Sequence, residues 1–178
     1  AFGAQNLVFK GDYKVFFSEQ NPELTAFESI QEIYAKSDNV AFILAPKNGD
    51  IFTKDNLTAV YWLTNESWQV PYSTRVDSIS NFQHTIAEED DLIVEDLVLD
   101  PDVLLASDMV RLKEIATNDP LLLNKIVSAT GHVSIVNITN QLPGIDPIGE
   151  IPDVSAKVRD IKGHFEEKFP TIDVQITG

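Results

Sequence analysis

Cysteine is absent from the 178 residues, so thiol catalysis, thiolate zinc sites and disulfide bonds are excluded. This absence does not fix the compartment, because a cysteine-free chain is compatible with oxidising and with reducing surroundings. The sequence also lacks a run of about 18 apolar residues, the length that a membrane-spanning helix requires. Its longest apolar run is Val40–Ala45, which has the length of a strand. We therefore expect no helix of this chain to cross a membrane.

Basic residues are scarce as well: 13 lysines and arginines stand against 28 acidic residues, for a formal net charge of −15. A surface of this sign repels nucleic-acid phosphates and anionic lipid headgroups, so we expect no nucleic acid as a partner. The apolar fraction of 43% is nevertheless high enough to build a core. The length suits one domain or two small ones. Because no Gly/Ser-rich linker divides the chain, we expect a single domain over residues 1–178.

Signatures of catalysis and of cofactor binding are lacking too. The three histidines form no His-Glu-x-x-His arrangement, and no Gly-x-Ser-x-Gly segment is present. Residues 144–149 have the glycine spacing of a phosphate-binding loop, but Glu150 follows where such a loop needs lysine. The acidic run at 88–91 lacks the alternating ligands of a calcium loop. We therefore predict no enzyme, no cofactor and no metal. A hydrolase with paired carboxylates stays open as an alternative, because a chain with so many acids always offers some pair.

Hydrophobic periodicity predicts a series of strands and helices. Val40–Ala45 is apolar throughout and bounded by polar residues, which is typical of a buried strand. Asp153 is expected to cap the clearest helix, in which apolar residues recur at helical spacing from Val154 to Phe169. The other expected elements are strands at 13–17, 74–86, 132–139 and 171–177, and helices at 21–36, at 53–68, from 107 or 108 onwards and at 119–131.

Two stretches are expected to lack regular structure. Residues 143–152 hold three prolines and two glycines, which predicts a loop. Between Val76 and Val110 there are ten acidic residues and no lysine or arginine, and the simplest interpretation is a solvated loop with a few apolar anchors. We call residues 88–108 the acidic excursion, and how it packs stays open. The first and last thirds of the chain each predict a strand-helix-strand unit. Two such units joined in one antiparallel or mixed sheet, with helices on one face, form an α+β sandwich.

Aromatic residues are candidates for lining a pocket for an apolar ligand. They are Tyr61, Trp62, Trp68, Tyr72 and Phe82. The alternative is that these side chains pack one helix against the sheet.

Arg75 and Asp77 are expected on one face of an extended segment, with Val76 and Ser78 on the other. No acid stands among the eight residues before Arg75, whereas many follow it. We therefore predict that Arg75 pairs with one of the acids that follow and so fixes the course of the acidic excursion.

An ordered set of segments resembles the first extracytoplasmic loop of MMPL-like exporters, which belong to the bacterial RND superfamily. The segments lead from a Phe-Thr entry to a helix, through an Arg-Val-x-Ser-x-x-Asn strand, to an acidic Leu-x-Val-Glu-Asp-Leu stretch. In this sequence they are residues 50–58, 63–64, 68, 70–72, 74–79, 81–84 and 91–97. Residues 17–24, 118–121, 127–128 and 132–139 resemble further parts of that loop in the same order. The similarity covers nearly the whole chain, from about Tyr13 to Ile176.

The resemblance implies that the parent protein is a proton-driven exporter of hydrophobic or amphiphilic molecules, often lipids, in the bacterial inner membrane. This chain would be its periplasmic porter domain, taken from between membrane helices, with the ferredoxin-like α+β fold of such domains. Family members place their proton-relay acids in membrane helices, so no residue here is expected to carry that role. A porter domain binds or guides an apolar substrate without chemistry. The alternative is an assembly module that contacts a periplasmic partner or another subunit, and a homo-oligomer stays open.

The candidate residues for substrate binding or for the structure of the site come from the resembling region. They are Trp62, Trp68, Arg75, Asp77, Asn81, Phe82 and Gln83. The acidic surface favours cationic or neutral amphiphiles over anionic ones as ligands, although a local pocket can override the net charge.

Overall fold

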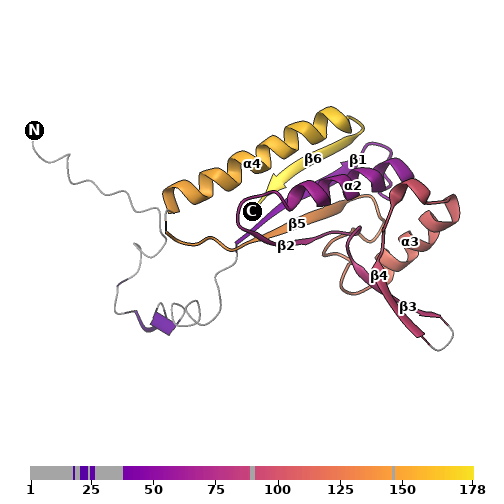
Figure 1. Ribbon diagram of the computed structural model, residues 1–178, viewed down its shortest axis with the longest axis horizontal. Coiled ribbons are helices and arrows are strands. Elements are labelled where there is room, and N and C mark those ends of the chain that lie inside the picture. The colour runs from indigo at the N-terminus through magenta and orange to yellow at the C-terminus, as the bar shows by residue number, and fades with distance from the viewer. Residues whose placement is uncertain (1–17, 19–20, 24, 27–37, 89–90, 146) are drawn as a thin grey trace, which may run out of the picture. The chain divides into compact units, whose positions relative to one another are not determined.

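The computed structural model describes residues 18, 21–23, 25–26, 38–88, 91–145 and 147–178 (Figure 1). Contacts divide the chain into two units, Ala1–Lys36 and Ser37–Gly178, and the single domain over 1–178 stays a prediction. In the first unit, Asn21 Oδ1 accepts a hydrogen bond from the backbone N–H of Glu23 at 2.9 Å. Residues 22–23 and 25–26 are helical, which confirms the predicted helix start at Asn21. The predicted strand at 13–17 and the rest of that helix lie outside the described residues.

The second unit is built on a four-stranded antiparallel sheet in the order β2-β5-β1-β6. Its central strand, β1 (Asp38–Pro46), pairs with β5 (Ser134–Asn140) on one side and with β6 (Ile172–Thr177) on the other. The short strand β2 (Ser73–Asp77) lies at the edge beside β5. The strands predicted at 40–45, 132–139 and 171–177 are thus confirmed.

Two helices cover one face of this sheet (Figure 1). Helix α2 (Lys54–Ser67) connects β1 to β2, and helix α4 (Pro147–Lys168) connects β5 to β6. The sheet and its helices therefore follow the order β-α-β-β-α-β, the split arrangement of two βαβ units. The predicted α+β sandwich with an antiparallel sheet is confirmed. The finer ferredoxin-like assignment stays a prediction, which this order of elements supports.

The core lies between the sheet and the two helices, because side chains alternate between the faces of a strand. Phe42 and Leu44 of β1 are fully buried under the helices, while Ala41 and Ile43, which alternate with them, are half-buried on the other face. From α4 the predicted stripe is buried: Val154, Val158, Ile161 and Phe165. The side chain of Thr53 accepts a hydrogen bond from the Asn56 N–H, as expected of a helix cap.

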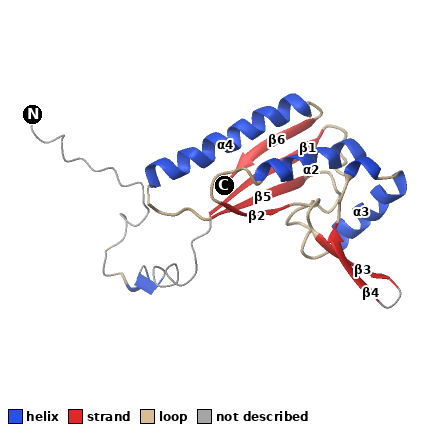
Figure 2. Cartoon of the chain, viewed as in Figure 1, coloured by secondary structure: helices blue, strands red, loops and turns tan. Residues whose placement is uncertain are grey.

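The acidic excursion is not a solvated loop, so this interpretation is wrong. Strands β3 (Gln83–Glu88) and β4 (Asp91–Asp96) form a separate two-stranded antiparallel sheet (Figure 2). A short 3-10 turn, η3 (Pro101–Val103), and helix α3 (Ala106–Asn118) follow. The backbone groups of β4 that face β3 form the hydrogen bonds of this antiparallel pair. The buried side chains of Leu97 and Val98 anchor the segment, and their N–H groups donate to the carbonyls of Phe82 and Ser80.

The predicted extended segment at 74–86 is two strands, β2 and β3, separated by a turn. The start of α3 also differs from the prediction, in which Ser107 or Asp108 caps the helix. Helix α3 begins at Ala106, and the Asp108 carboxylate accepts a hydrogen bond from the Leu105 N–H at 2.9 Å. Leu112 is buried as expected, whereas Val110 is 69% exposed.

The helix predicted at 119–131 is wrong as well. Residues 120–127 form a chain of turns, and Asn124 adopts a left-handed backbone with φ of 58°. An L-residue with positive φ cannot continue a right-handed helix. Gly131 also has positive φ, at 75°, but it lies in the tight turn before β5, which explains why a glycine stands there.

The loop predicted at 143–152 is too long, because α4 begins at Pro147 and not after Asp153. Pro147 stands at the first helical position, where its missing N–H costs nothing. The buried carboxylate of Glu150 accepts hydrogen bonds from the N–H groups of Gly144 and Ile145. Three prolines in ten residues indicated a loop, but two of them lie within the helix. Within the described part of the chain, no helix is both long and apolar enough to span a membrane.

Candidate functional site

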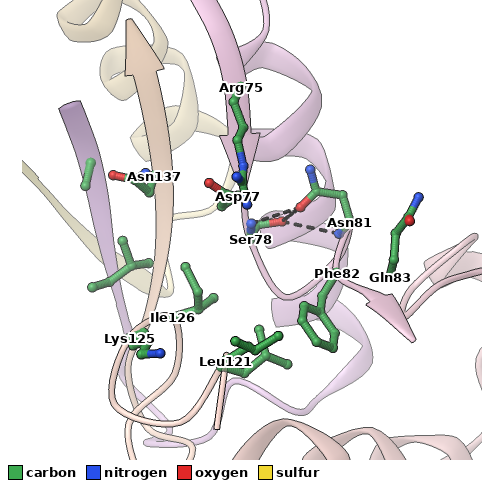
Figure 3. A pocket seen from close by; sticks show the side chains of 13 residues that line it. Arg75, Asp77, Ser78, Asn81, Phe82, Gln83, Leu121, Lys125, Ile126 and Asn137 are labelled. Atoms are coloured by element: carbon green, nitrogen blue, oxygen red, sulfur yellow. Dashed lines mark hydrogen bonds and ion pairs between the residues drawn. The ribbon is translucent and has the colours of Figure 1, made fainter. Parts of the chain in front are cut away.

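A cavity of about 790 Å³ opens on the sheet face that α2 and α4 leave uncovered. Strands β1 and β5 supply its wall through the side chains that alternate with the core residues. The turn at 78–83 and the segment at 121–126 enclose it from two sides (Figure 3). The apolar lining residues are Ala41, Phe82, Leu121, Leu122, Ile126 and Ile135, and the polar ones are Arg75, Asp77, Ser78, Asn81, Gln83, Lys125 and Asn137.

Arg75 and Asp77 lie on the cavity side of β2, as predicted, while Val76 between them is buried on the opposite side. Arg75 Nε donates to Asp77 Oδ1 at 2.7 Å. The partner of Arg75 is therefore an acid of its own strand, and within the described residues no acid of 88–108 contacts it. The predicted pairing of Arg75 with one of the acids that follow it is confirmed by Asp77, whereas its role in fixing the course of the acidic excursion stays a prediction. Because the Arg75 side chain is 72% exposed, this pair adds little to stability.

Asn81 holds the turn between β2 and β3 in place. Its Oδ1 accepts from the backbone N–H of Ser78 at 2.9 Å, and its Nδ2 donates to the carbonyl of Val76 at 2.7 Å. Asparagine commonly closes a turn by such bonds to nearby backbone groups. The side chain thus shapes one wall of the cavity from within the turn (Figure 3).

Three buried hydroxyl groups fasten this turn to helix α2. The hydroxyls of Thr64, Ser78 and Ser80 lie 2.8 to 2.9 Å from one another. Thr64 comes from α2, and its hydroxyl also bonds to the Val60 carbonyl. A buried polar network of this kind specifies one arrangement when all its members are satisfied. Sequence reasoning missed Thr64 and Ser80, because nothing in the sequence places the inner face of α2 against this turn.

Phe82 and Gln83 lie at the end of this turn, where β3 begins, and both line the cavity. Phe82 is half-buried and its ring points into the hollow (Figure 3). Gln83 and Asn81 also line a second, smaller hollow of about 330 Å³, together with Tyr61 and Trp68. The two hollows therefore meet at the same two amide side chains.

The predicted aromatic group is divided between different places in the fold. Trp68 is 50% exposed and lies at the second hollow. Trp62 instead packs between α2 and α4, with its ring centroid 6.1 Å from that of Phe165 and 5.8 Å from that of Phe169. Lys168 Nζ lies 5.1 Å from the Trp62 ring centroid, which is a cation–π distance. For Trp62 the core-packing alternative therefore describes the structure, and Trp62 lines neither hollow.

The cavity residues that sequence reasoning missed come from two sources. Leu121, Lys125 and Ile126 belong to the turns at 120–127, which periodicity assigned to a helix. Ile135 and Asn137 lie on the outer face of β5, and the alternation of that strand held the signal that would have found them. No pattern in the sequence shows that these two segments meet β2.

One carboxylate among the described residues lines the cavity. It belongs to Asp77 and is held by Arg75, so no pair of described acids faces the space. Elsewhere the Ser128 hydroxyl lies 3.1 Å from His132 Nδ1, but it also accepts the backbone N–H groups of His132 and Val133, which is the pattern of a structural turn. Residues 38–88, 91–145 and 147–178 contain no group of three or more histidines and acids placed to hold a metal ion.

Comparison with known proteins adds no family assignment. No protein-family model matches the chain, and no curated protein matches it at a significant level. The resemblance to exporter loops therefore stays a prediction that depends on the ordered segments alone.

Proposed function

We propose that this chain is the periplasmic porter domain of a bacterial inner-membrane exporter, and that its cavity binds a hydrophobic or amphiphilic substrate in transit. The observation that carries the proposal is the cavity itself. Its volume of about 790 Å³ lies in the usual range of small-molecule sites, about 300–1,000 Å³. Five of the seven residues singled out from the sequence line it: Arg75, Asp77, Asn81, Phe82 and Gln83.

The distribution of side chains suits a molecule with one apolar and one polar end. Leu121 and Ile126 offer apolar surface on one side of the cavity, whereas Arg75 and Asn137 offer polar groups on the strands (Figure 3). A ligand that covers the apolar side removes this surface from water, which is the main source of its affinity. A long chain can extend toward the second hollow, past the amides that both hollows share.

The proposal predicts binding without turnover, and calorimetric titration of the 178-residue chain with single-chain amphiphiles below their micelle concentration tests it. We expect dissociation constants of roughly micromolar to millimolar, because an isolated domain supplies only part of a transport path. Leu121→Asp is expected to weaken binding about tenfold or more, since it puts a charge against the apolar ligand.

A matched control is available in Leu105→Asp. Leu121 is 62% and Leu105 66% exposed, so both changes are expected to leave folding intact, but Leu105 does not line the cavity. If no amphiphile binds, or if both variants lose affinity equally, the cavity is not the binding site.

A second candidate function, docking to a protein partner, is favoured by the hairpin of β3 and β4. Leu92, Ile93 and Val94 are 75%, 40% and 57% exposed in consecutive positions of a two-stranded sheet. Exposed apolar side chains of this size often mark protein contacts, and the acids around them favour a partner with basic residues.

Self-association is the form of docking that can be measured with the chain alone, without a partner protein. Sedimentation velocity of the chain and of the double variant Leu92→Ser and Val94→Ser measures it. If the chain sediments as an oligomer and the variant as a monomer, the hairpin is an assembly surface, whatever the amphiphile titrations show.

A further inference from the structure

The candidate cavity differs in charge from the rest of the molecule. The chain carries a formal charge of −15, yet the cavity is lined by two cationic side chains, Arg75 and Lys125, and one carboxylate, Asp77. The two cations come from different segments, the edge strand β2 and the turns at 120–127 (Figure 3). The charges of the side chains that line the cavity therefore sum to +1, which is opposite in sign to the net charge of the chain.

The Arg75 guanidinium is only partly engaged. Its Nε donates to Asp77, and in the described part of the chain its two terminal amino groups make no hydrogen bond or ion pair. A guanidinium has five N–H donors in a fixed plane, so four remain for a ligand. The bond to Asp77 orients this plane from one side, which leaves the fork formed by the terminal amino groups available.

Lys125 makes no ion pair with the described residues. It is exposed, and among the described residues no acid lies within ion-pair distance of its Nζ. The segment that carries it also supplies Leu121 and Ile126, so a cation and apolar surface stand side by side at the cavity. This combination matches a molecule with an anionic head and an apolar tail.

We propose that the cavity prefers amphiphiles with a singly charged anionic head, and that Arg75 is the residue that recognises the head. This inference rests on the proposed substrate-binding function of the same cavity. A carboxylate matches the planar fork of arginine in a way that an ammonium or a sugar head does not. One excess positive charge suits one negative charge, and the Asp77 carboxylate beside the fork disfavours heads of higher charge.

The overall negative charge does not prevent this selectivity, because most acids of the chain act on the head group only from a distance. At physiological salt, interactions between exposed charges are largely screened beyond about 8 Å. A head in contact with Arg75 therefore responds to the charges that line the cavity more than to acids elsewhere on the chain. The net charge slows the approach of an anion, whereas the contact with Arg75 sets its affinity.

Three amphiphiles with twelve-carbon chains test the inference: dodecanoate, dodecyltrimethylammonium and dodecyl maltoside. Calorimetric titration of the 178-residue chain below the micelle concentration gives a dissociation constant for each. We expect dodecanoate to bind about tenfold more tightly than dodecyltrimethylammonium. Arg75→Gln is expected to weaken dodecanoate about tenfold and to leave the maltoside unchanged, and Asp77→Asn is expected to tighten dodecanoate by about threefold.

Arg111→Gln on α3 is the matched control, since it removes the same charge from an exposed residue outside the cavity. An equal loss of dodecanoate affinity in this control would attribute the effect to net charge and overturn the inference. Binding of dodecyltrimethylammonium as tight as that of dodecanoate would overturn it too, while leaving the cavity as a binding site. If none of the three binds, the proposed function itself fails.

Discussion

Large apolar side chains are exposed more often in the insertion between β2 and β5 than in the sandwich. In the sandwich, residues such as Phe42 and Leu44 are fully buried between the sheet and the helices. In the insertion, Leu92 is 75% and Val110 69% exposed, although Leu97 and Val98 anchor the segment to the core. Buried apolar area is what stabilises a fold, so the sandwich is expected to hold most of the stability. The insertion exposes apolar side chains such as Leu92 to solvent. It also supplies Phe82, Leu121 and Lys125 to the cavity.

The largest loss of stability is expected from a change in the core of the sandwich. Phe165 is fully buried in α4, with its ring centroid 6.1 Å from that of Trp62 and 5.1 Å from that of Phe169. Phe165→Ala removes these contacts and leaves a cavity, so we expect a cost of about 3–5 kcal/mol. Chemical denaturation checks this, with the exposed Glu167→Ala on the same helix as the control. A loss no larger than that of the control would show that the α4 stripe does not carry the core.

The sandwich was also the part that the sequence predicted well. Strands β1, β5 and β6 and the stripe of α4 have long, regular patterns, because each element buries one continuous face. The insertion was predicted poorly, because parts of it bury no continuous face. Strand β4 exposes most of its side chains, so they follow no period of burial, and the left-handed backbone at Asn124 depends on local contacts that no spacing reveals.

The candidate site shows the same division. Arg75 and Asp77 were placed correctly on one face because strand alternation is a local rule. Lys125 and Ile126 were missed because their part in the cavity depends on a contact between segments about 50 residues apart in the sequence. The turn network of Thr64, Ser78 and Ser80 escaped for a related reason: hydroxyl groups carry no periodic signal, and only the packed fold brings them together.

Asn81 holds the turn that this network fastens to α2, and removing its hydrogen bonds is expected to cost less than breaking the core. Asn81→Ala leaves the Ser78 N–H and the Val76 carbonyl without their partner. Partly buried groups that lose a hydrogen bond cost about 1–3 kcal/mol. Hydrogen exchange is the sharper measurement here, because we expect the amides of residues 78–82 to exchange faster while those of β1 keep their protection. Unchanged exchange at the Ser78 amide would contradict the role of Asn81 in the turn.

A smaller loss is expected at the start of α4, where structure and sequence pattern disagree about the capping residue. Glu150 is 4% exposed and accepts two backbone N–H groups, whereas Asp153, which the pattern favoured, is exposed within the helix. We expect Glu150→Ala to cost about 1–2 kcal/mol and Asp153→Ala to cost less than about 0.5 kcal/mol. Thermal melts of the two variants, measured side by side, decide between them. If Asp153→Ala is the more destabilising change, the helix begins where the sequence pattern placed it.

The smallest effect on stability is expected at the tip of the insertion, and it is the most direct test of the contrast between the two regions. Leu92 lies on β4 and is 75% exposed, whereas Leu44 lies on β1 and is fully buried. Leu92→Ser is expected to change the free energy of unfolding by less than about 0.5 kcal/mol, as exposed positions usually do. Leu44→Ser removes buried apolar surface and places an extra hydroxyl in the core, so we expect it to cost more than about 3 kcal/mol. Urea denaturation of both variants gives the two values under the same conditions. A cost of more than about 1 kcal/mol for Leu92→Ser would mean that its side chain is covered in solution, which places a partner or a second copy of the chain on the hairpin.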